Sequence, residues 1–290
     1  MNLDHFGVNT VTLAGNLEGK LRAVRDAGFA QIVLSAQDIV GHPGGEAAAL
    51  AALRSSGLRP AGLQVLRDFE GLEGHLHDYK VDVAKSMLDM CRATGARLLL
   101  VSSSTSSHSS GEAGRLVRDL RKLATLAVPY GVRVAYEALS WGRHVNEPLQ
   151  AWDIVAEADR ANLGLMLDSF HLMAAKTSLD ALEEIVAGKI FLVQLSDFLW
   201  QENRSRAERI ATATHFRVFP GEGMHGAEVI GLVRKLDRIG YRGDYSFEVY
   251  NDDYMQLPPA VVAGRARRSV KWITDQVSRR SLPPRRLVVS

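Results

Sequence analysis

Three carboxylates and one carboxamide stand at or near the ends of four short, strand-like segments in the second half of the chain. The segments and their polar residues are 133–137 with Glu137, 163–168 with Asp168, 190–195 with Gln194, and 245–249 with Glu248. If these segments are neighbouring parallel strands, the four side chains converge, and their negative charges repel one another unless a cation lies among them. Hard oxygen ligands without thiolate or imidazole favour Mg²⁺ or Mn²⁺ over Zn²⁺. The pattern therefore predicts a divalent metal site, against the alternative that each residue only caps its strand.

Histidine and asparagine side chains follow two of these segment ends. His171 comes three residues after Asp168, so it is a candidate general base beside the metal. His144 and Asn146 follow Glu137 and are candidate substrate contacts. A lone histidine is usually structural, and only its short turn with a predicted ligand singles out His171.

Two arginines are candidates for binding an anionic substrate group. Arg67 follows the strand-like segment 61–66, and Arg217 precedes the glycine-containing segment 220–223. A guanidinium can bind a substrate carboxylate through two charge-assisted hydrogen bonds. The alternative for Arg217 is that it pins its own loop by pairing with an acid such as Glu222.

The elements that must position these residues recur along the chain. Amphipathic stretches end at glycines, which tolerate the left-handed conformation that closes a helix; these are Gly28, Gly57, Gly95, Gly131 and Gly240. Short, mostly apolar runs follow, as expected of buried parallel strands. The eight predicted strands are 6–11, 31–34, 61–66, 97–101, 133–137, 163–168, 190–195 and 245–249.

Eight strands alternating with helices over about 250 residues predict an α/β fold, a closed (β/α)₈ TIM barrel. An open, doubly wound sheet is the competing arrangement, but no Gly-x-Gly-x-x-Gly follows the first strand, where such a sheet usually carries it. In the barrel, active sites lie at the carboxyl ends of the strands, where the candidate residues stand. We expect one barrel domain over residues 1–277 and a disordered basic tail over 278–290.

Composition restricts the class of protein further. The 290 residues are 46% hydrophobic, which is ample for a large core. The single cysteine, Cys91, cannot form an internal disulfide and shares a predicted helix face with Ala84 and Leu88, so we expect it in the core of a cytoplasmic protein. No apolar run reaches the roughly 18 residues of a membrane span, so no membrane association is expected.

The charge of the chain lies unevenly. The net charge is only +2, and the tail alone contains four arginines, so the rest of the chain is weakly acidic. This distribution predicts no nucleic-acid partner. We expect a small-molecule partner, a carboxylated or polyhydroxylated substrate, and a possible homo-oligomer.

Two further features lie where loops should surround the predicted site. The serine-rich segment 102–111 predicts a mobile loop after the fourth strand, with a substrate-contacting lid as the alternative. Trp141 and Trp200 fall in loops at the same end, where each could wall a pocket or pack on the rim.

Several segments are similar to a known enzyme group. Segments 67–71, 137–146, 167–171, 215–221 and 247–252 resemble the bacterial 3-dehydroshikimate dehydratases, which belong to the sugar isomerase/epimerase-like barrels related to xylose isomerase. The resemblance implies a divalent metal held by the same four residues, Glu137, Asp168, Gln194 and Glu248. It also implies that His171 and Arg217 contact the substrate.

The resemblance leaves two reactions open. A dehydratase would convert 3-dehydroshikimate to protocatechuate and water through an enolate, with His171 or a nearby carboxylate taking the proton. A metal-dependent sugar or sugar-phosphate isomerase or epimerase would use the same metal, and a phosphate could bind the backbone amides of segment 220–223. A non-catalytic barrel or a DNA-repair endonuclease fits less well, because the repair enzymes use several metal-binding histidines and the acidic body suits a phosphate backbone poorly.

Overall fold

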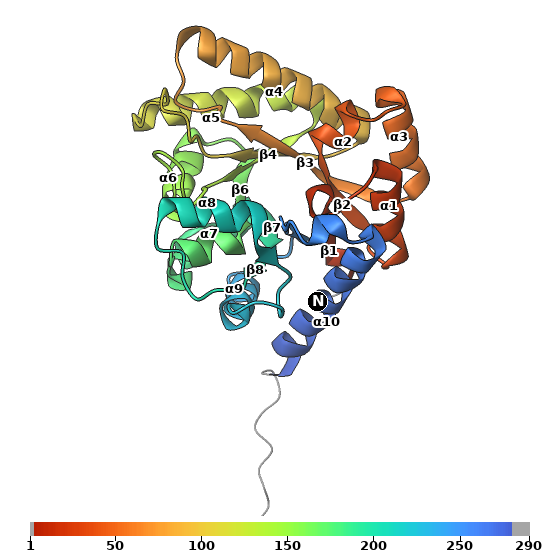
Figure 1. The fold of residues 1–290 in the computed structure, drawn as a ribbon. Helices are drawn as coiled ribbons and strands as arrows, with labels where there is room; N and C mark the ends of the chain where they lie inside the picture. Colours follow the sequence, from red (N-terminus) through yellow and green to blue (C-terminus); the bar gives the residue numbers. More distant parts are fainter. Residues whose placement is uncertain (1–2, 280–290) are drawn as a thin grey trace, which may run out of the picture.

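Eight parallel strands close into a barrel in the computed structural model, which describes residues 3–279 (Figure 1). Around the barrel, the strands follow the order of the chain, and β10 closes the ring between β7 and β1. The barrel strands are β1 (Phe6–Asn9), β2 (Gln31–Ser35), β3 (Arg59–Arg67), β4 (Leu98–Ser102), β5 (Arg133–Glu137), β6 (Leu163–Asp168), β7 (Ile190–Leu195) and β10 (Asp244–Phe247). The predicted TIM barrel is confirmed, and the open sheet is excluded.

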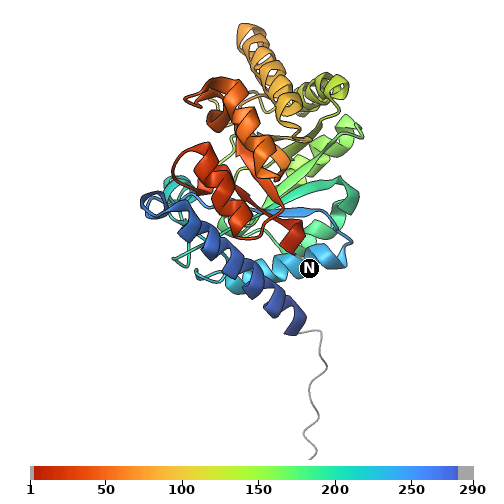
Figure 2. The ribbon, with the colours of Figure 1, turned by 90° about the vertical axis from the view of Figure 1, so that its right-hand side faces the viewer.

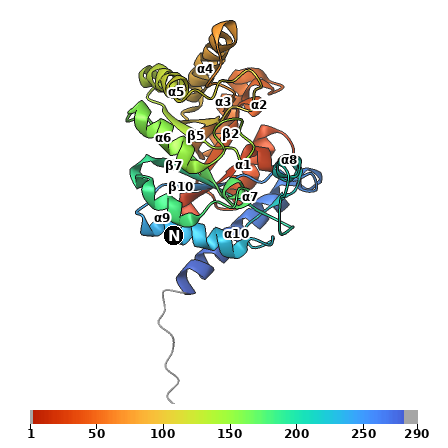
Figure 3. The same ribbon diagram turned by 90° about the vertical axis from the view of Figure 1, so that its left-hand side faces the viewer.

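Helices surround the strands on the outside of the barrel (Figures 2 and 3). The helices are α1 (Leu17–Asp26), α2 (Ala36–Val40), α3 (Gly45–Ser56), α4 (Gly74–Thr94), α5 (Ala113–Ala127), α6 (Pro148–Ala158), α7 (Ser169–Ala174), α8 (Arg206–His215), α9 (Gly226–Arg238) and α10 (Pro259–Arg279). The last helix, α10, packs beside the first, α1, and Arg267 Nη1 donates to the Ala27 carbonyl at 3.2 Å. This contact completes the ring of helices.

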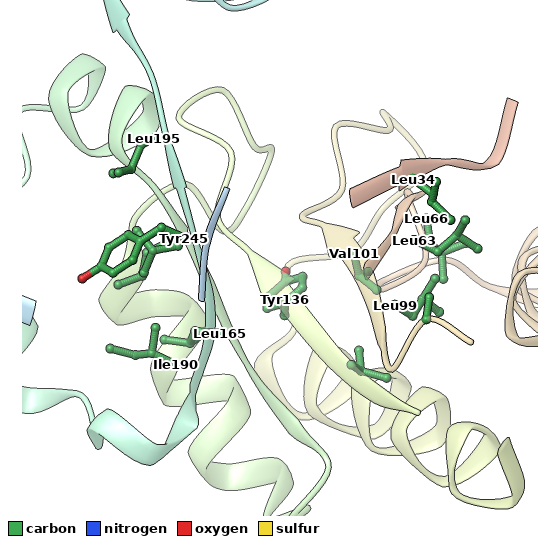
Figure 4. Packing of buried hydrophobic residues seen from close by; sticks show 14 of the residues in the cluster. Leu34, Leu63, Leu66, Leu99, Val101, Tyr136, Leu165, Ile190, Leu195 and Tyr245 are labelled. Atoms are coloured by element: carbon green, nitrogen blue, oxygen red, sulfur yellow. The ribbon is translucent and has the colours of Figure 1, made fainter. Parts of the chain in front are cut away.

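Alternate residues of each strand pack into two different cores. In β4, Leu98 and Leu100 belong to a cluster built from strand residues alone, which fills the barrel interior. Leu99 and Val101 belong to a larger cluster shared with the surrounding helices, which also includes Cys91. Figure 4 shows members of this larger cluster from the strands on both sides of the barrel. The two-residue period therefore decides which side chains can reach the barrel axis.

The glycines predicted to end helices have the expected conformation, with φ between 64° and 95° at all five positions. Strand bounds differ from the predictions by one or two residues at several ends. A small antiparallel pair was not predicted, because two-residue strands carry no periodic pattern; it consists of β8 (Asp197–Phe198) and β9 (Arg217–Val218). This pair and α8 lie between β7 and α9, and they place Arg217 over the barrel.

The end of the chain bears on two predictions. Helix α10 continues through Arg279, two residues beyond the predicted end of the barrel domain at 277. The rest of the predicted basic tail, 280–290, lies outside the described residues. Among residues 3–279, no helix combines the length and the apolar character needed to cross a bilayer.

Candidate active site at the mouth of the barrel

A cavity of about 290 Å³ opens at the carboxyl ends of the barrel strands. Five of the predicted site residues line it: Arg67, Glu137, His171, Arg217 and Glu248. The other lining residues are mostly apolar or hydroxylated, and they are Gln64, Val65, Leu100, Ser102, Thr105, Leu139, Trp141, Met166, Ile210, Ala213, Thr214 and Tyr250. Another cavity, of about 330 Å³, lies between α7 and α9 and contains none of the predicted residues.

The four predicted metal ligands lie together at this end of the barrel, and all four are buried. Glu137 and Asp168 end β5 and β6, Gln194 is near the end of β7, and Glu248 follows β10. Asp168 stands opposite Gln194 in the register of β6 and β7. The Gln194 amide donates to Glu248 Oε1 at 3.4 Å. The closed sheet thus brings together residues that are more than 100 positions apart.

The donor atoms of this cluster fit a divalent cation. Glu137 Oε1 and Gln194 Oε1 are buried and have no hydrogen-bond partner among the described residues. The amide of Gln194 donates to both Gln64 Oε1 and Glu248 Oε1, so its oxygen stays free. Burial, with the charges of Asp168 and Glu248, raises the pKa of Glu137 well above its usual value. A bound cation would relieve this repulsion and use both free oxygens.

The hydrogen bonds of His171 decide which ring nitrogen carries the proton. Its Nδ1 accepts the backbone N–H of Ser140 at 3.1 Å, so the neutral ring has its proton on Nε2. Nε2 lies 3.7 Å from Glu137 Oε1. Ligand atoms of Glu137, Asp168 and His171, one from each, lie within 4.8 Å of one another, so this imidazole is also placed to hold a metal ion. Burial lowers the pKa of His171 to about 3. In this form the Nε2–H of His171 points toward Glu137 at a distance too long for a hydrogen bond, and the role of His171 as a general base stays a prediction.

Arg217 is held by the predicted metal ligands themselves. Its Nη1 donates to Asp168 Oδ2 at 2.6 Å and to Glu248 Oε2 at 3.3 Å, and Nε donates to the Ala213 carbonyl. The guanidinium carbon lies 4.6 Å from the centre of the Phe170 ring. Nη2 makes no hydrogen bond with the described residues. Arg217 therefore offers a single nitrogen to the cavity and not the two-nitrogen fork that we expected.

Arg67 presents the open guanidinium at the mouth. It lies at the end of β3, is exposed, lines the cavity, and makes no side-chain hydrogen bond or ion pair within the described part of the chain. Its positive charge lowers the pKa of Glu137, although burial and the neighbouring carboxylates outweigh this effect. Tyr250 also lines the cavity, its hydroxyl makes no hydrogen bond with the described residues, and burial raises its pKa. Arg67, Tyr250 and Nη2 of Arg217 are therefore donors available to a ligand in the cavity.

The structure does not bring His144 and Asn146 into the cavity. His144 Nε2 lies 2.8 Å from the Ser109 carbonyl, and its ring packs against Gly111, where a Cβ atom would clash. The Asn146 amide donates to the Gly142 carbonyl, and its side chain faces a small void beside Asp168. Both residues organise the loops around the mouth, because the chain after β5 folds back on the loop after β4.

The loop 102–111 is anchored by hydrogen bonds and does not have the free backbone expected of a mobile loop. The N–H of Ser104 donates to Glu70 Oε1, and the N–H of Thr105 donates to Asp68 Oδ1. Thr105 lines the cavity, in keeping with the substrate-contacting alternative. Of the two tryptophans, Trp141 also lines the cavity, while Trp200 donates to Asn203 and Thr212 on the rim.

Segment 220–223 offers poor surroundings for an anion, because the buried carboxylate of Asp197 packs directly against Gly223. Within the segment, the N–H of Glu222 already donates to the Phe219 carbonyl. The Glu222 side chain accepts hydrogen bonds from Arg265 and Tyr254, so it does not pair with Arg217. The loop-pinning alternative for Arg217 therefore does not apply to Glu222.

Two buried amides were missed by sequence reasoning. Asn9 Nδ2 donates to Gln64 Oε1 at 2.8 Å and to Glu248 Oε1 at 3.3 Å, and Gln64 accepts the Gln194 amide as well. Both lie inside the barrel on strands that otherwise bury apolar residues. Their position in the two-residue period, which places them on the same inner face as the ligands, is the signal that could have found them.

Comparison with known proteins identifies the family. Residues 21–276 match the sequence profile of the xylose isomerase-like TIM barrel. The chain belongs to the xylose isomerase-like TIM barrel family. Within this family, a 3-dehydroshikimate dehydratase from Pseudomonas aeruginosa is 35% identical over 269 residues, which are 93% of this chain and 42% of that protein. An inosose isomerase from Bacillus licheniformis is 28% identical over 212 residues, covering 69% of this chain and 70% of that protein.

A solved structure has the same fold. A xylose isomerase-like TIM barrel/4-hydroxyphenylpyruvate dioxygenase fusion protein superposes on this barrel with a TM-score of 0.89 at 32% identity. The match covers 99% of this chain and 46% of the fusion protein. The chain thus spans less than half the length of the fusion protein and of the Pseudomonas dehydratase.

Proposed function

We propose that this barrel is a metal-dependent 3-dehydroshikimate dehydratase, a hydro-lyase that forms protocatechuate and water. The observation that carries the proposal is the open guanidinium of Arg67 in the same cavity as Glu137 and Glu248. It supplies a site for a substrate carboxylate next to groups that can move protons. The 35% identity to a protein named 3-dehydroshikimate dehydratase supports the same substrate.

Glu137, Asp168, Gln194 and Glu248 would hold the metal, for which their oxygen atoms favour Mg²⁺ or Mn²⁺. When bound, such a cation supplies a Lewis acid that polarises a ketone and stabilises negative charge on its oxygen. The protein prepares this position by leaving two buried oxygens without partners. Removing the metal should therefore abolish turnover.

The side chains of the cavity carry out the proton transfers of the dehydration. Glu137 or Glu248 takes the proton from the carbon next to the ketone, because His171 holds its own proton on Nε2 and cannot accept another there. The Nε2–H of His171 points toward Glu137. A hydroxyl leaves from the β carbon with one added proton, as water, and loss of a further ring proton with protonation of the ketone oxygen gives the aromatic product.

The substrate carboxylate lies at the rim in this proposal. Arg67 binds it, and Nη2 of Arg217 is the second available donor. A planar guanidinium can donate two parallel hydrogen bonds to a carboxylate, which an ammonium group cannot do. This arrangement turns the ring so that its ketone side faces the predicted metal.

A sugar isomerase or epimerase is the second candidate function. It is favoured by the 28% identity to an inosose isomerase and by the same pair of glutamates, which could exchange a proton on a polyhydroxylated ring. A phosphorylated substrate is disfavoured, because the buried carboxylate of Asp197 packs against segment 220–223 and would repel a phosphate there. The alternative is therefore an isomerase of an unphosphorylated polyol ketone.

The deciding experiment uses Mn²⁺-reconstituted protein with 3-dehydroshikimate. The dehydratase proposal predicts a new aromatic absorbance band and release of protocatechuate, both abolished by EDTA. A Glu137→Gln variant is the matched negative control. No aromatic product from the reconstituted wild-type protein, together with isomerisation of an inosose, would replace this proposal with the isomerase.

A further inference from the structure

Glu70 is a buried carboxylate for which the reaction above has no use. It lies in the loop after β3, and the residue is 1% exposed. Its Oε1 accepts the backbone N–H of Ser104 at 2.5 Å and the hydroxyl of Tyr136 at 2.9 Å, while Oε2 has no hydrogen-bond partner. Burial raises the pKa of Glu70 to about 7. Burying a carboxyl group with one oxygen unpaired opposes folding. A function for Glu70 at this position would explain why it is there.

The two hydrogen bonds of Glu70 join three segments at the mouth. The loop of Glu70 begins with Arg67, the open cation of the cavity. Ser104 belongs to the loop after β4, whose next residue, Thr105, lines the cavity and donates its N–H to Asp68 Oδ1 at 2.8 Å. Tyr136 lies in β5 with its ring in the core. One carboxylate oxygen thus links the loop after β3 to the loop after β4 and to β5, beside the Asp68–Thr105 hydrogen bond and that from the Ser110 N–H to the Gly71 carbonyl.

The predicted metal ligand in β5 has separate support. Glu137 stands opposite Ser102 in the register of β4 and β5, and its carbonyl accepts the N–H of Ser103 at 2.8 Å. Arg67 likewise stands opposite Ser102 in the register of β3 and β4, so the ladder fixes the ends of all three strands without Glu70. The hydrogen bonds of Glu70 act beyond these strand ends, so a change at Glu70 should disturb the loops at the cavity more than the backbone of Glu137.

We propose that Glu70 is a positioning residue for substrate binding, holding the loops of Arg67 and Thr105 at the spacing that the substrate carboxylate requires. The inference rests on the proposed function, in which Arg67 binds that carboxylate. The positioning role depends on how far the acceptor oxygen extends from the backbone, because the Ser104 N–H and the Tyr136 hydroxyl both donate to Oε1. The negative charge itself has no cationic partner within hydrogen-bond distance in the described structure.

Two matched variants separate reach from charge. Glu70→Gln keeps an acceptor oxygen at the same reach and loses the charge, whereas Glu70→Asp keeps the charge and withdraws the oxygen by about 1.5 Å, one carbon–carbon bond. Glu70→Asp should raise KM for 3-dehydroshikimate about tenfold or more, and Glu70→Gln should restore KM to within about threefold of wild type. The Mn²⁺ affinity of both variants should match that of wild-type protein.

Three results would overturn the proposal. A raised KM in Glu70→Gln with a wild-type KM in Glu70→Asp would assign the effect to charge. A lower Tm in Glu70→Asp with an unchanged KM would leave Glu70 only a structural role. If Glu70→Asp does not fold, Tyr136→Phe serves in its place, since it keeps the ring and removes one donor; an unchanged KM in that variant would overturn the proposal equally.

Amide hydrogen exchange tests the positioning without any turnover. Peptides covering 102–111 should exchange faster in Glu70→Asp than in wild-type protein, and at the wild-type rate in Glu70→Gln. Inactive wild-type protein with this exchange pattern would remove the dehydratase proposal and keep Glu70 as the residue that fixes the loop. Equal exchange in all three proteins would remove the positioning role itself, whatever the activity.

Discussion

The guanidinium of Arg217 lies 2.6 Å from the carboxylate of Asp168, and both side chains are buried. The same nitrogen, Nη1, lies 3.3 Å from Glu248 Oε2. Arg217 therefore offsets negative charge on two of the residues predicted to bind a cation. Arginine and metal act on the same carboxylates, so the stability of the protein and its affinity for metal should be linked through this residue.

The first prediction follows from that link. Arg217→Ala leaves Asp168 and Glu248 buried without their cation, a change that typically costs about 3–5 kcal/mol. In EDTA, the Tm of the variant should fall well below that of wild type. Saturating Mn²⁺ should raise the Tm of the variant by more than it raises that of wild type, because the metal replaces the missing charge. Thermal melts with and without Mn²⁺ measure both quantities.

The control for this prediction is Arg265→Ala. Arg265 pairs with Glu222 at 3.1 Å, away from the predicted metal ligands. Its variant should show the wild-type increase in Tm on adding Mn²⁺. If Mn²⁺ raised the Tm of Arg217→Ala and of wild type equally, the metal would not replace the charge of Arg217, and the prediction would be wrong.

The second prediction concerns the metal ligands. Glu137→Gln or Glu248→Gln should abolish Mn²⁺ binding in isothermal titration calorimetry, while the far-ultraviolet circular dichroism spectrum stays unchanged. In Glu137→Gln the metal-free Tm should not fall, because Glu137 Oε1 has no hydrogen bond to lose. Glu222→Gln, outside the cluster, should bind Mn²⁺ like wild type. Retained binding in both ligand variants would refute the assignment.

The convergence of the four predicted ligands could be foreseen because a closed parallel barrel leaves little freedom in where strand ends lie. Once Glu137 and Asp168 end neighbouring strands, the parallel register puts them at one rim, and the two-residue period turns them inward. The barrel and its order of strands were predicted for the same reason. Local sequence patterns are enough to place a side chain where the hydrogen-bonded strands fix its position.

Residues whose positions depend on loop paths could not be predicted. His144 follows β5, as a substrate contact should, but the loop after β4 takes up its ring against Gly111. The pairing of Arg217 with Asp168 depends on the β8–β9 pair, which has no sequence signal. Spacing along the chain places a side chain at the mouth, but contacts between loops decide whether it faces the cavity.

The third prediction concerns Arg67 and the substrate carboxylate. Arg67→Ala should lower kcat/KM for 3-dehydroshikimate about 30- to 160-fold, as expected for the loss of roughly 2–3 kcal/mol of charge-assisted hydrogen bonding. The kcat/KM of Arg67→Lys should lie between those of Arg67→Ala and wild type, because the ammonium keeps the positive charge but lacks the planar pair of donors. The Tm should stay near that of wild type, since the side chain is exposed.

The methyl ester of 3-dehydroshikimate isolates the carboxylate. Wild type should use the ester poorly, and Arg67→Ala should use acid and ester almost equally. Arg143→Ala, which removes an exposed arginine that does not line the cavity, should leave the ratio unchanged. A loss of activity in Arg67→Ala that is equal for acid and ester would show that Arg67 does not recognise the carboxylate.

The last prediction concerns pH and Glu70. Burial raises the pKa of this carboxyl from 4.5 to about 7, and the neighbouring charge of Asp68 acts in the same direction, while the hydrogen bonds from Ser104 and Tyr136 act against it. Between these two pH values, the folded protein keeps a proton on Glu70 that the unfolded chain releases. Ionisation therefore favours the unfolded state as the pH rises through this window, and the free energy of unfolding falls.

Glu70→Gln removes this titration and keeps the acceptor oxygen. The free energy of unfolding of Glu70→Gln, minus that of wild type, should increase by up to about 3 kcal/mol between pH 4.5 and pH 7 and stay level above pH 8. Urea unfolding of both proteins in EDTA measures the difference, and subtraction cancels the titration of the metal ligands, which both proteins share. A difference that stays constant from pH 4.5 to pH 8 would mean that Glu70 has the same pKa in the folded and unfolded chain, and that the buried oxygen without a partner is solvated by water.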